Sequence, residues 1–451
     1  LESLKICYNK NTMIYLDHAA ATPVSPNALR AMLPYFSDDF FNPSAPYLPA
    51  KRVREAYESA KNDIAHAIGA KGTDLVITAG ATESINLAFT ATRLSAPKAL
   101  VRSEASLRSD AEITGSLRFG KILTLVTEHA AVLEAVKNYP HELVEVDKNG
   151  LINLDDFRKK LSDEVVLVSV SLANNELGTI QPLAEISEIL RLERQKRLRQ
   201  GITTPLYLHS DASQALSLLD INVARLGVDL LTLNAAKCGG PKGVGALYLA
   251  HGITLHPLSL GGGQERGLRS GTENVPGVIG FATAVKEAKT HLSSSRNKYQ
   301  EMASVLRQEL AHTSIVAQND KKVKQNPKTP QNSQISPNSK NSQEIPIAAP
   351  IFLGNPKHQL ANFVPVCFPG LDAERLIYKL EQQEIYLSTG AACAANKGSK
   401  SHVLAAIGLS DAEIAGSLRI SLGSTNDLDQ IREAAEKIRE AVEQEYQRLA
   451  R

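Results

Sequence analysis

Short runs of apolar residues alternate along the chain with longer stretches in which apolar side chains recur every three or four positions. Apolar runs of about four to eight residues are typical of strands in a parallel sheet that helices cover on both faces. Helical periodicity between such runs, as at 183–200, gives the alternation of an α/β fold. The predicted strands are 74–78, 121–126, 165–172, 206–209, 230–233 and 244–249.

In the last third of the chain the pattern changes. Apolar side chains recur at spacings of three and four from Val278 to Leu310, which predicts a long helix, continuous or broken. Beyond it, 363–368 is strand-like, a helix begins at Asp372, and a charged helix begins at Leu428. This mixed order predicts a second, smaller α+β domain.

Two segments interrupt these patterns and are interpreted as insertions. Residues 318–345 are rich in Asn, Gln, Ser, Pro and Lys, so they are expected to be disordered. The other insertion, 95–120, contains DAEITGSLR at 110–118, which differs at one position from DAEIAGSLR at 411–419. A single echo is not a repeat architecture, so no function is assigned to the first copy.

Composition excludes several classes of protein. The 451 residues are 43% hydrophobic and 22% charged, and their net charge is +2, which argues against binding of nucleic acid or a membrane surface through bulk charge. No apolar run approaches the ~18 residues of a membrane-spanning helix. The four cysteines lie far apart, outside the spacings of metal sites. We therefore expect a reduced, cytoplasmic enzyme without disulfides or bound metal.

The start of the chain carries a separate signal. The first methionine is Met13, where a strand-like MIYLD run begins. Residues 1–12 are interpreted as an extension ahead of the start, with an ordered N-terminal arm as the alternative. They lack the apolar segment of a secretory signal.

The strongest chemical signal is a lysine between a strand and a glycine-rich turn. Lys237 follows the apolar strand at 230–233 and precedes GGPKG at 239–243. Burial lowers the pKa of a lysine, and the neutral amine can then form a Schiff base. Such turns are common and many lysines are merely solvated, so the motif alone leaves both interpretations open.

Other polar residues also follow predicted strands. Asp211 could pair with a protonated pyridine nitrogen, or it could cap a helix. The small residues at 78–84 could hold a phosphate at a helix N-terminus with help from the Thr82 hydroxyl, or could be ordinary capping. His129 could stack on a cofactor ring or move a proton, and the Asn175 amide could reach a phenolate or carboxylate. Because strands of an open α/β sheet end at one crevice, these groups could share one site.

Two residues late in the chain complete the candidates. Cys393 lies in LSTGAACAAN, among small residues that suit a reactive thiol, although a buried structural cysteine is the usual alternative. Cys238 and Cys367 have apolar neighbours instead. Arg419 lies in a strand-like segment and could clamp a substrate carboxylate through two hydrogen bonds.

In their order and spacing, these motifs resemble the cysteine desulfurases of the IscS/NifS-like group, which are class V aminotransferases among the fold-type I pyridoxal-phosphate enzymes. The resemblance runs from YLDHAA at 15–20 to the last helix, apart from the two insertions. It implies a large domain at 21–275 with a mainly parallel sheet of the seven-stranded type between helices. It also implies a small domain at 276–451, which the segment 1–20 joins.

The resemblance implies a role for each motif residue toward pyridoxal 5′-phosphate. Lys237 is the Schiff-base lysine, Asp211 is the partner of the pyridine nitrogen, and His129 stacks on the ring. Gln214 and Asn175 flank the phenolate oxygen. The other implied cofactor contacts are Ala81 through its backbone N–H, Thr82, Asn234 and Thr272.

For catalysis, the resemblance implies L-cysteine as the substrate. Arg419 and Asn175 bind its carboxylate, and Cys393 attacks its sulfur. The reaction leaves a persulfide on Cys393 and releases L-alanine, while Lys237 or His129 moves protons.

The resemblance also implies protein partners. In the family the threonine that corresponds to Thr272 reaches the phosphate of the partner subunit, which implies a homodimer. The loop around Cys393 suits delivery of sulfur to an acceptor protein, either a scaffold for iron–sulfur clusters or a relay for tRNA thiolation.

One departure from the family pattern bears on the cofactor. The usual Ser-x-His-Lys is here Asn234-Ala235-Ala236-Lys237. Because Ala236 cannot donate a hydrogen bond to the phosphate, a lower cofactor affinity is expected. Two other interpretations stay open: another class V enzyme, such as a selenocysteine lyase or an aminotransferase, and a catalytically weakened dimeric scaffold.

Overall fold

The computed structural model describes residues 13–94, 118–312, 348–390 and 400–450. Contacts between residues divide the chain into two compact units. The large unit comprises Ala19–Ser295 and Gly354–Leu360, and the small unit comprises Leu1–His18, Arg296–Leu353 and Ala361–Arg451. Each unit has a sheet of its own.

A seven-stranded sheet forms the centre of the large unit, in the order β2-β10-β9-β8-β7-β5-β6. All neighbouring strands are parallel except at β10, which runs antiparallel to β2 and β9. The strands are β2 (Leu75–Thr78), β5 (Lys121–Leu125), β6 (His141–Val144), β7 (Val165–Ser169), β8 (Tyr207–Asp211), β9 (Leu230–Asn234) and β10 (Gly245–Leu249). The prediction of a mainly parallel sheet is confirmed.

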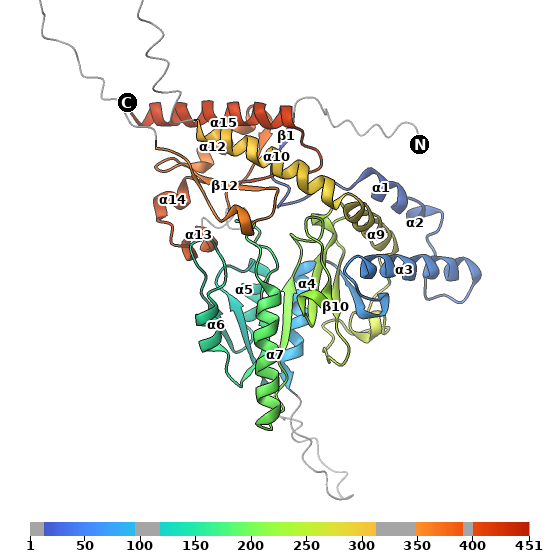
Figure 1. Ribbon diagram of the computed structural model, residues 1–451. Coiled ribbons are helices and arrows are strands. Elements are labelled where there is room, and N and C mark those ends of the chain that lie inside the picture. The colour runs from blue at the N-terminus through green and yellow to red at the C-terminus, as the bar shows by residue number, and fades with distance from the viewer. Residues whose placement is uncertain (1–12, 95–117, 313–347, 391–399, 451) are drawn as a thin grey trace, which may run out of the picture. The chain divides into compact units, whose positions relative to one another are not determined.

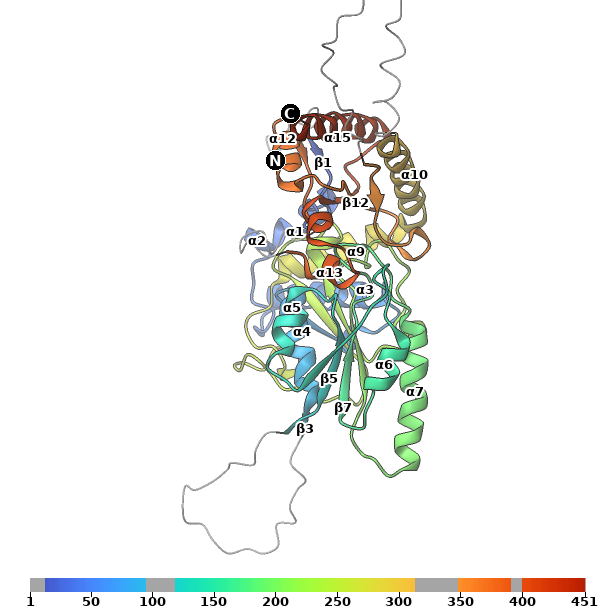
Figure 2. The ribbon, with the colours of Figure 1, turned by 90° about the vertical axis from the view of Figure 1, so that its left-hand side faces the viewer.

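Helices cover both faces of this sheet. In Figure 2, α4 and α5 lie on one side of β5 and β7, and α6 and α7 lie on the other. The helices are α1 (Pro26–Met32), α2 (Pro34–Ser37), α3 (Leu48–His66), α4 (Ala81–Phe89), α5 (Ala130–Val136), α6 (Leu154–Lys160), α7 (Leu183–Arg199), α8 (Val223–Leu226) and α9 (Val275–Thr290). Across the parts of the chain that the structure describes, no helix combines the length and apolarity needed to cross a membrane.

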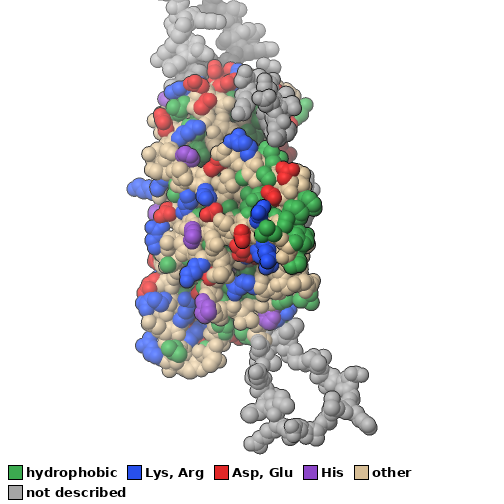
Figure 3. All heavy atoms as spheres, turned by 90° about the vertical axis from the view of Figure 1, so that its right-hand side faces the viewer, with side chains coloured by type: hydrophobic (Ala, Val, Ile, Leu, Met, Phe, Trp, Pro, Cys, Tyr) green, Lys and Arg blue, Asp and Glu red, His purple; other side chains and the backbone are tan. Residues whose placement is uncertain are grey.

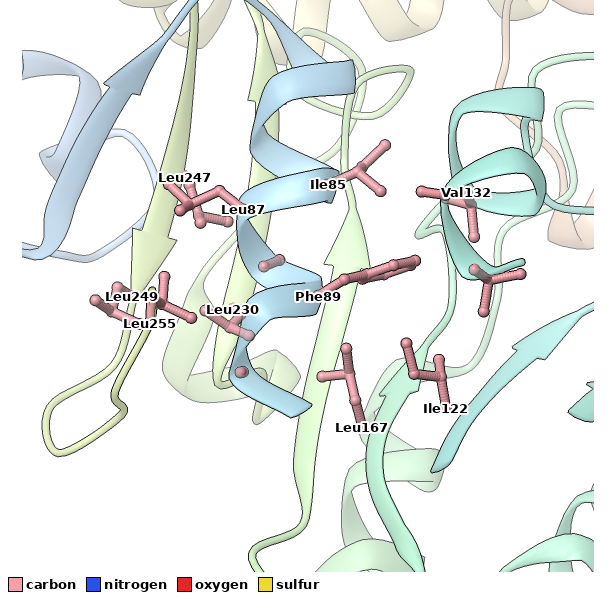
Figure 4. Close-up of a cluster of buried hydrophobic side chains, with 14 of the residues drawn as sticks. Ile85, Leu87, Phe89, Ile122, Val132, Leu167, Leu230, Leu247, Leu249 and Leu255 are labelled. Atoms are coloured by element: carbon pink, nitrogen blue, oxygen red, sulfur yellow. The ribbon is translucent and has the colours of Figure 1, made fainter. Parts of the chain in front are cut away.

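The main buried cluster lies between the sheet and the pair α4 and α5. Phe89 points from α4 toward Val132 of α5, over Ile122 and Leu167 of the sheet (Figure 4). All four side chains are fully buried. Burial of one such side chain contributes about 1.5–3 kcal/mol, so this cluster holds α4 against the face of the sheet.

The small unit is built on a three-stranded antiparallel sheet, in the order β11-β12-β14, and a parallel pair of β1 with β13. The strands are β1 (Ile14–Tyr15), β11 (Ile351–Phe352), β12 (Phe363–Cys367), β13 (Ile385–Tyr386) and β14 (Ser417–Ser421). The helices are most of α10 (Leu292–Ala311), α12 (Ala373–Glu381), α13 (His402–Ala406), α14 (Asp411–Ala415) and α15 (Leu428–Leu449). Within this unit, α12 packs against α15 (Figure 1).

The division between the units differs from the predicted boundary at 276. α9 packs against α1 and α3 of the large unit, so the division falls after Ser295. The apolar periodicity runs through α9 and α10 alike, and a pattern of this kind does not reveal which partner a helix packs against. Residues Gly354–Leu360 also return to the large unit, where Ile180 N donates to His358 O at 2.8 Å.

The pattern of apolar runs missed one strand of the large sheet. β6 lies at the sheet edge, and only Val144 among its residues is buried, so it lacks an apolar run. The residues just before the predicted insertion at 95–120, β3 (Arg93–Leu94), form a short antiparallel pair with β4 (Arg118–Phe119) near its end. Residues 95–117 lie outside the described residues, as do 1–12 and 318–345.

Candidate functional site

Lys237 and Gln214 donate to the same carbonyl oxygen. Lys237 ends a short turn of 3-10 helix that directly follows β9, and Gln214 lies shortly after β8. Lys237 Nζ donates to Ala19 O at 2.8 Å and also to Ala20 O, and Gln214 Nε2 donates to Ala19 O at 2.9 Å. The structure thus brings together two predicted residues, both half-buried, through the backbone of the segment at which the resemblance begins.

Asp211 lies at the same end of the neighbouring strand. It is the last residue of β8, it pairs with Thr232 of β9 in parallel register, and it is only 8% exposed. Its Oδ1 accepts a hydrogen bond from Ser213 N at 2.9 Å, so the carboxylate also caps the turn after the strand. Both interpretations of Asp211 therefore remain compatible with its position, which is the strand end where α/β sheets bind ligands.

The turn from β2 into α4 forms one wall of a cavity. Gly80 has φ 147°, which residues with a side chain rarely adopt. α4 begins at Ala81, and the first N–H groups of a helix have no partner within it. The cavity measures about 590 Å³, which is within the range of small-molecule sites. It is lined by Ala79, Gly80, Ala81, Thr82, Glu83, Asn86, Asn234, Ala236, Lys242, Gly243 and Leu258.

The cavity contains most of the predicted phosphate residues and two that the motifs did not single out. Ala81, Thr82 and Asn234 are among its lining residues. Glu83 and Lys242 are the charged residues of the described lining. Asn234 Oδ1 accepts from Ala236 N at 3.3 Å, which holds the turn that leads to the lysine.

His129 caps the helix that follows it. Its Nδ1 accepts a hydrogen bond from Ala131 N at 3.0 Å at the start of α5. A nitrogen that accepts carries no proton, so the neutral ring is protonated at Nε2. The structural role and the proposed chemical role therefore use different ring nitrogens.

The turn with His129 is fastened to the turn with Asn175. Asn174 Nδ2 donates to Thr127 O at 2.9 Å, and Asn174 is buried. Asn175 itself is half-buried. Because two turns that follow β5 and β7 are joined by this hydrogen bond, His129 and Asn175 lie at the same edge of the sheet.

Glu128 is a buried carboxyl group beneath this edge that the motifs did not identify. It accepts hydrogen bonds from Ser171 N at 2.8 Å and from Ser171 Oγ. Burial raises the pKa of Glu128 to about 8; the charge of Asp211 acts in the same direction, and the Ser171 hydrogen bonds act against it. Glu128 is therefore mostly protonated at neutral pH. Its position directly before His129 was the only signal in the sequence.

Arg419 belongs to the small unit, where it is held by an acid. It lies in β14 and is 4% exposed, and its Nη2 pairs with Asp17 Oδ1 at 2.7 Å. Its backbone N donates to Ser388 O at 2.7 Å. Asp17 lies far away in the sequence, so spacing could not indicate the pair. Cys393 lies outside the described residues.

The two described cysteines are poor nucleophiles. Cys238 and Cys367 are both buried. Burial raises the pKa of the Cys238 thiol to about 12 and that of Cys367 to about 11. Because the thiolate is the reactive form, neither of them is suited to attack a substrate sulfur.

Thr272 is exposed at the end of a glycine-rich loop that Glu265 fastens to the large unit. Glu265 accepts from Tyr57 Oη at 2.6 Å and from Ile77 N at 2.7 Å, and it pairs with Lys61 at 2.9 Å. Its φ of 46° is left-handed, a conformation that costs a non-glycine residue about 1–2 kcal/mol. The buried hydrogen bonds offset this cost and so define the path of the loop.

Comparison with known proteins places these observations in a family. The family Aminotransferase class-V matches residues 14–345. The chain is 34% identical over 438 residues to a cysteine desulfurase IscS of Methanosarcina thermophila, covering 95% of this chain and 92% of that protein. It is 32% identical over 435 residues to a putative cysteine desulfurase IscS 1 of Bacillus subtilis (strain 168), covering 95% and 98%.

Solved structures give the same result. A NifS-like protein superposes with a TM-score of 0.76 at 28% identity, covering 95% of this chain and 98% of that one. The protein SspA in complex with cysteine superposes with a TM-score of 0.65 at 28% identity, covering 91% and 98%. The fold expected from the resemblance, that of the fold-type I enzymes, is therefore confirmed.

Proposed function

The chain belongs to the aminotransferase class-V family, within its cysteine desulfurases, and on this premise we propose that it uses pyridoxal 5′-phosphate to take sulfur from L-cysteine and release L-alanine. One observation carries the proposal: the Lys237 amine and the Gln214 amide converge on Ala19 O, at the strand ends where Asp211 lies. An amine, an amide and a buried carboxylate at one sheet edge suit a ring with a phenolate and a protonated nitrogen.

Residues of the cavity wall, together with Asp211 at the end of β8, fit such a cofactor. The start of α4, with Ala81 and Thr82, presents N–H groups and a hydroxyl to a dianionic phosphate, and Lys242 adds a positive charge. Asp211, 8% exposed, is suited to hold a proton on the ring nitrogen. When bound, the cofactor supplies an electron sink for negative charge at the substrate carbon.

The large unit supplies the groups proposed to move protons. Lys237 Nζ would attach the cofactor and, when released by the substrate, serve as a base at the substrate carbon. Its hydrogen bonds to two backbone carbonyl groups orient the amine. His129 would face the ring, with Nε2 as the nitrogen that exchanges a proton, because Nδ1 is used by the cap.

The small unit supplies the groups proposed to handle the substrate. Arg419 would bind the carboxylate, a role that the resemblance also implies for Asn175. The thiolate of Cys393 would bond to the substrate sulfur. The carbon–sulfur bond breaks with its electron pair left on carbon, and protonation of that carbon gives L-alanine. The sulfur remains on Cys393 as a persulfide, for an acceptor in iron–sulfur cluster assembly or tRNA thiolation.

A homodimer is part of the proposal. Hydrophobic side chains gather on the face shown in Figure 3. Phe36, Phe40 and Leu48, from the region of α1 to α3, are each more than 60% exposed. Phe40 stacks on Phe41 with ring centroids 4.7 Å apart. An exposed aromatic cluster of this kind supports a subunit interface, which Thr272 would complete by reaching the phosphate of the partner.

The test compares two cysteine variants. Cys393→Ser should keep the visible absorption band of the bound cofactor and its response to L-cysteine, while formation of alanine and sulfide is lost. Cys367→Ser is the matched control, because Cys367 is buried and its thiol donates to Glu413 O at 3.2 Å, which a serine can also do.

Three results would contradict parts of this function. Sulfide release by Cys393→Ser at the rate of the unmodified chain would exclude Cys393 as the nucleophile. A band that responds to selenocysteine or alanine but not to cysteine would favour another class V enzyme. A chain that takes up no cofactor would favour a dimeric scaffold.

A further inference from the structure

The cavity at the start of α4 contains a carboxylate that conflicts with an anionic ligand. Glu83 lies in the first turn of α4 and lines the cavity. Its Oε2 accepts a hydrogen bond from Ala79 N at 2.5 Å, so the side chain holds the turn from β2 into the helix. The same negative charge would repel a phosphate group at the N-terminus of α4 and would compete for the helix dipole.

An arginine from a distant segment neutralises this carboxylate. Arg269 Nε pairs with Glu83 Oε1 at 3.1 Å, and the two side chains are 29% and 23% exposed. The backbone of Arg269 is bridged to Ser259, the residue after Leu258 of the cavity wall. Arg269 also follows Glu265, whose buried hydrogen bonds fasten the loop. The loop is therefore held in a conformation in which the Arg269 guanidinium group pairs with Glu83.

The Arg269–Glu83 pair changes the net charge that the cavity presents to a ligand. With Glu83 and Lys242 as the charged residues of the described lining, the wall alone has no net charge. Arg269 cancels Glu83 and leaves the positive charge of Lys242 next to the helix N-terminus. The cavity then favours a dianion, and Glu83 keeps its hydrogen bond to Ala79 N.

We propose that Arg269 is a positioning residue for the phosphate site, which acts through Glu83 by removing the repulsion between that carboxylate and the phosphate group of the cofactor. This inference rests on the proposed function for the identity of the ligand. Glu83 and Arg269 therefore shape the phosphate site although neither of them needs to touch the phosphate.

The test measures affinity for two forms of the cofactor by equilibrium dialysis of the full-length apoprotein. The phosphate group of pyridoxal 5′-phosphate would be repelled by the Glu83 carboxylate, whereas pyridoxal has no phosphate group. Arg269→Gln should lower the preference for the phosphorylated form about tenfold, since the unpaired carboxylate acts over a few ångströms in a partly exposed site. The double variant Arg269→Gln with Glu83→Gln should restore the preference, because glutamine keeps the acceptor for Ala79 N.

A matched ion pair outside the cavity serves as the control. Asp156, in the first turn of α6, accepts from Glu145 N at 2.9 Å and pairs with Lys160 at 2.8 Å, with side chains 22% and 21% exposed. Lys160→Gln should leave the preference unchanged. Thermal unfolding of each variant shows whether the chain remains folded, and Arg269→Lys, which keeps the charge, should bind like the unmodified chain.

The possible results separate the two proposals. An equal loss for both ligands in Arg269→Gln would assign Arg269 a merely structural role and overturn the inference. A loss that Glu83→Gln does not restore would mean that Arg269 acts on the phosphate directly, which also overturns it. If the unmodified chain itself shows no preference for the phosphorylated form, the cofactor assignment fails, and the inference fails with it.

Discussion

In the large unit the candidate residues are held mainly by backbone groups, whereas in the small unit the candidate arginine is held by an acidic side chain. Lys237 and Gln214 donate to Ala19 O, and His129 accepts from Ala131 N. Arg419 instead pairs with Asp17 at 2.7 Å. Backbone partners persist through most substitutions, while a buried ion pair depends on both of its residues. The large site should therefore tolerate changes around it better than the Arg419 site.

The largest effect is expected from loss of the amine itself. Lys237→Ala should lower turnover by at least about a thousandfold, because it removes both the attachment point and a general base. Bound cofactor and alanine formation are the measurements. Lys137→Ala, an exposed lysine paired with Glu134 on α5, is the control and should remain active. Substantial turnover in Lys237→Ala would refute the role of Lys237.

The contrast between the units is tested most directly at Asp17. Asp17→Asn leaves Arg419 buried without its carboxylate, so it should lower the free energy of unfolding by about 3 kcal/mol. Urea unfolding measures this change. Asp220→Asn weakens surface pairs with Arg225 and Lys289, and because the Asp220 side chain is 63% exposed, it should change stability by less than about 1 kcal/mol. Equal losses of stability in the two variants would show that the buried Asp17–Arg419 pair matters no more than an exposed pair.

The raised pKa of Glu128 predicts that the free energy of unfolding depends on pH. Its pKa is raised by burial from 4.5 to about 8, so the folded state binds the proton more tightly than the unfolded state. Its contribution to stability is present below the unfolded pKa and is lost as the pH rises through the folded value, by up to about 1.4 kcal/mol per pH unit. Glu128→Gln should flatten this slope between pH 5 and 8. An unchanged slope in urea unfolding would contradict the assignment.

The smallest effect is expected at Ala236. Ala236→His restores the donor that the family motif has before the lysine, in a residue that lines the cavity. One added hydrogen bond to a phosphate should tighten cofactor binding by about fivefold, measured by dialysis. Ala412→His, at an exposed position of α14 in the small unit, should not change the affinity. Weaker cofactor binding in Ala236→His would show that the cavity has no room for an additional donor at this position.

Sequence patterns predicted the centre of the fold well and its outer parts less well. The apolar runs located β7 and β9 because those strands are buried along most of their length. They missed β6, which is largely exposed at the sheet edge. They also assigned α9 to the small domain, because helical periodicity reports an apolar face but not the surface that it covers.

The candidate site shows a similar limit. Lys237, Asp211 and Thr82 stood out because each follows an apolar strand within a local motif. Glu83 and Arg269 did not stand out, since a charge gains its role only from a partner that is distant in the chain.

The sequence by itself determined most strands of the large sheet, the order of the chemical motifs and the family, because periodicity, capping and turn residues act over a few neighbouring positions. Only the tertiary structure decided which groups meet. Glu83 with Arg269, Asp17 with Arg419 and Lys61 with Glu265 join segments that are distant in the sequence. Such pairs form because the path of the chain brings their elements together, and burial then strengthens an interaction that no local pattern records.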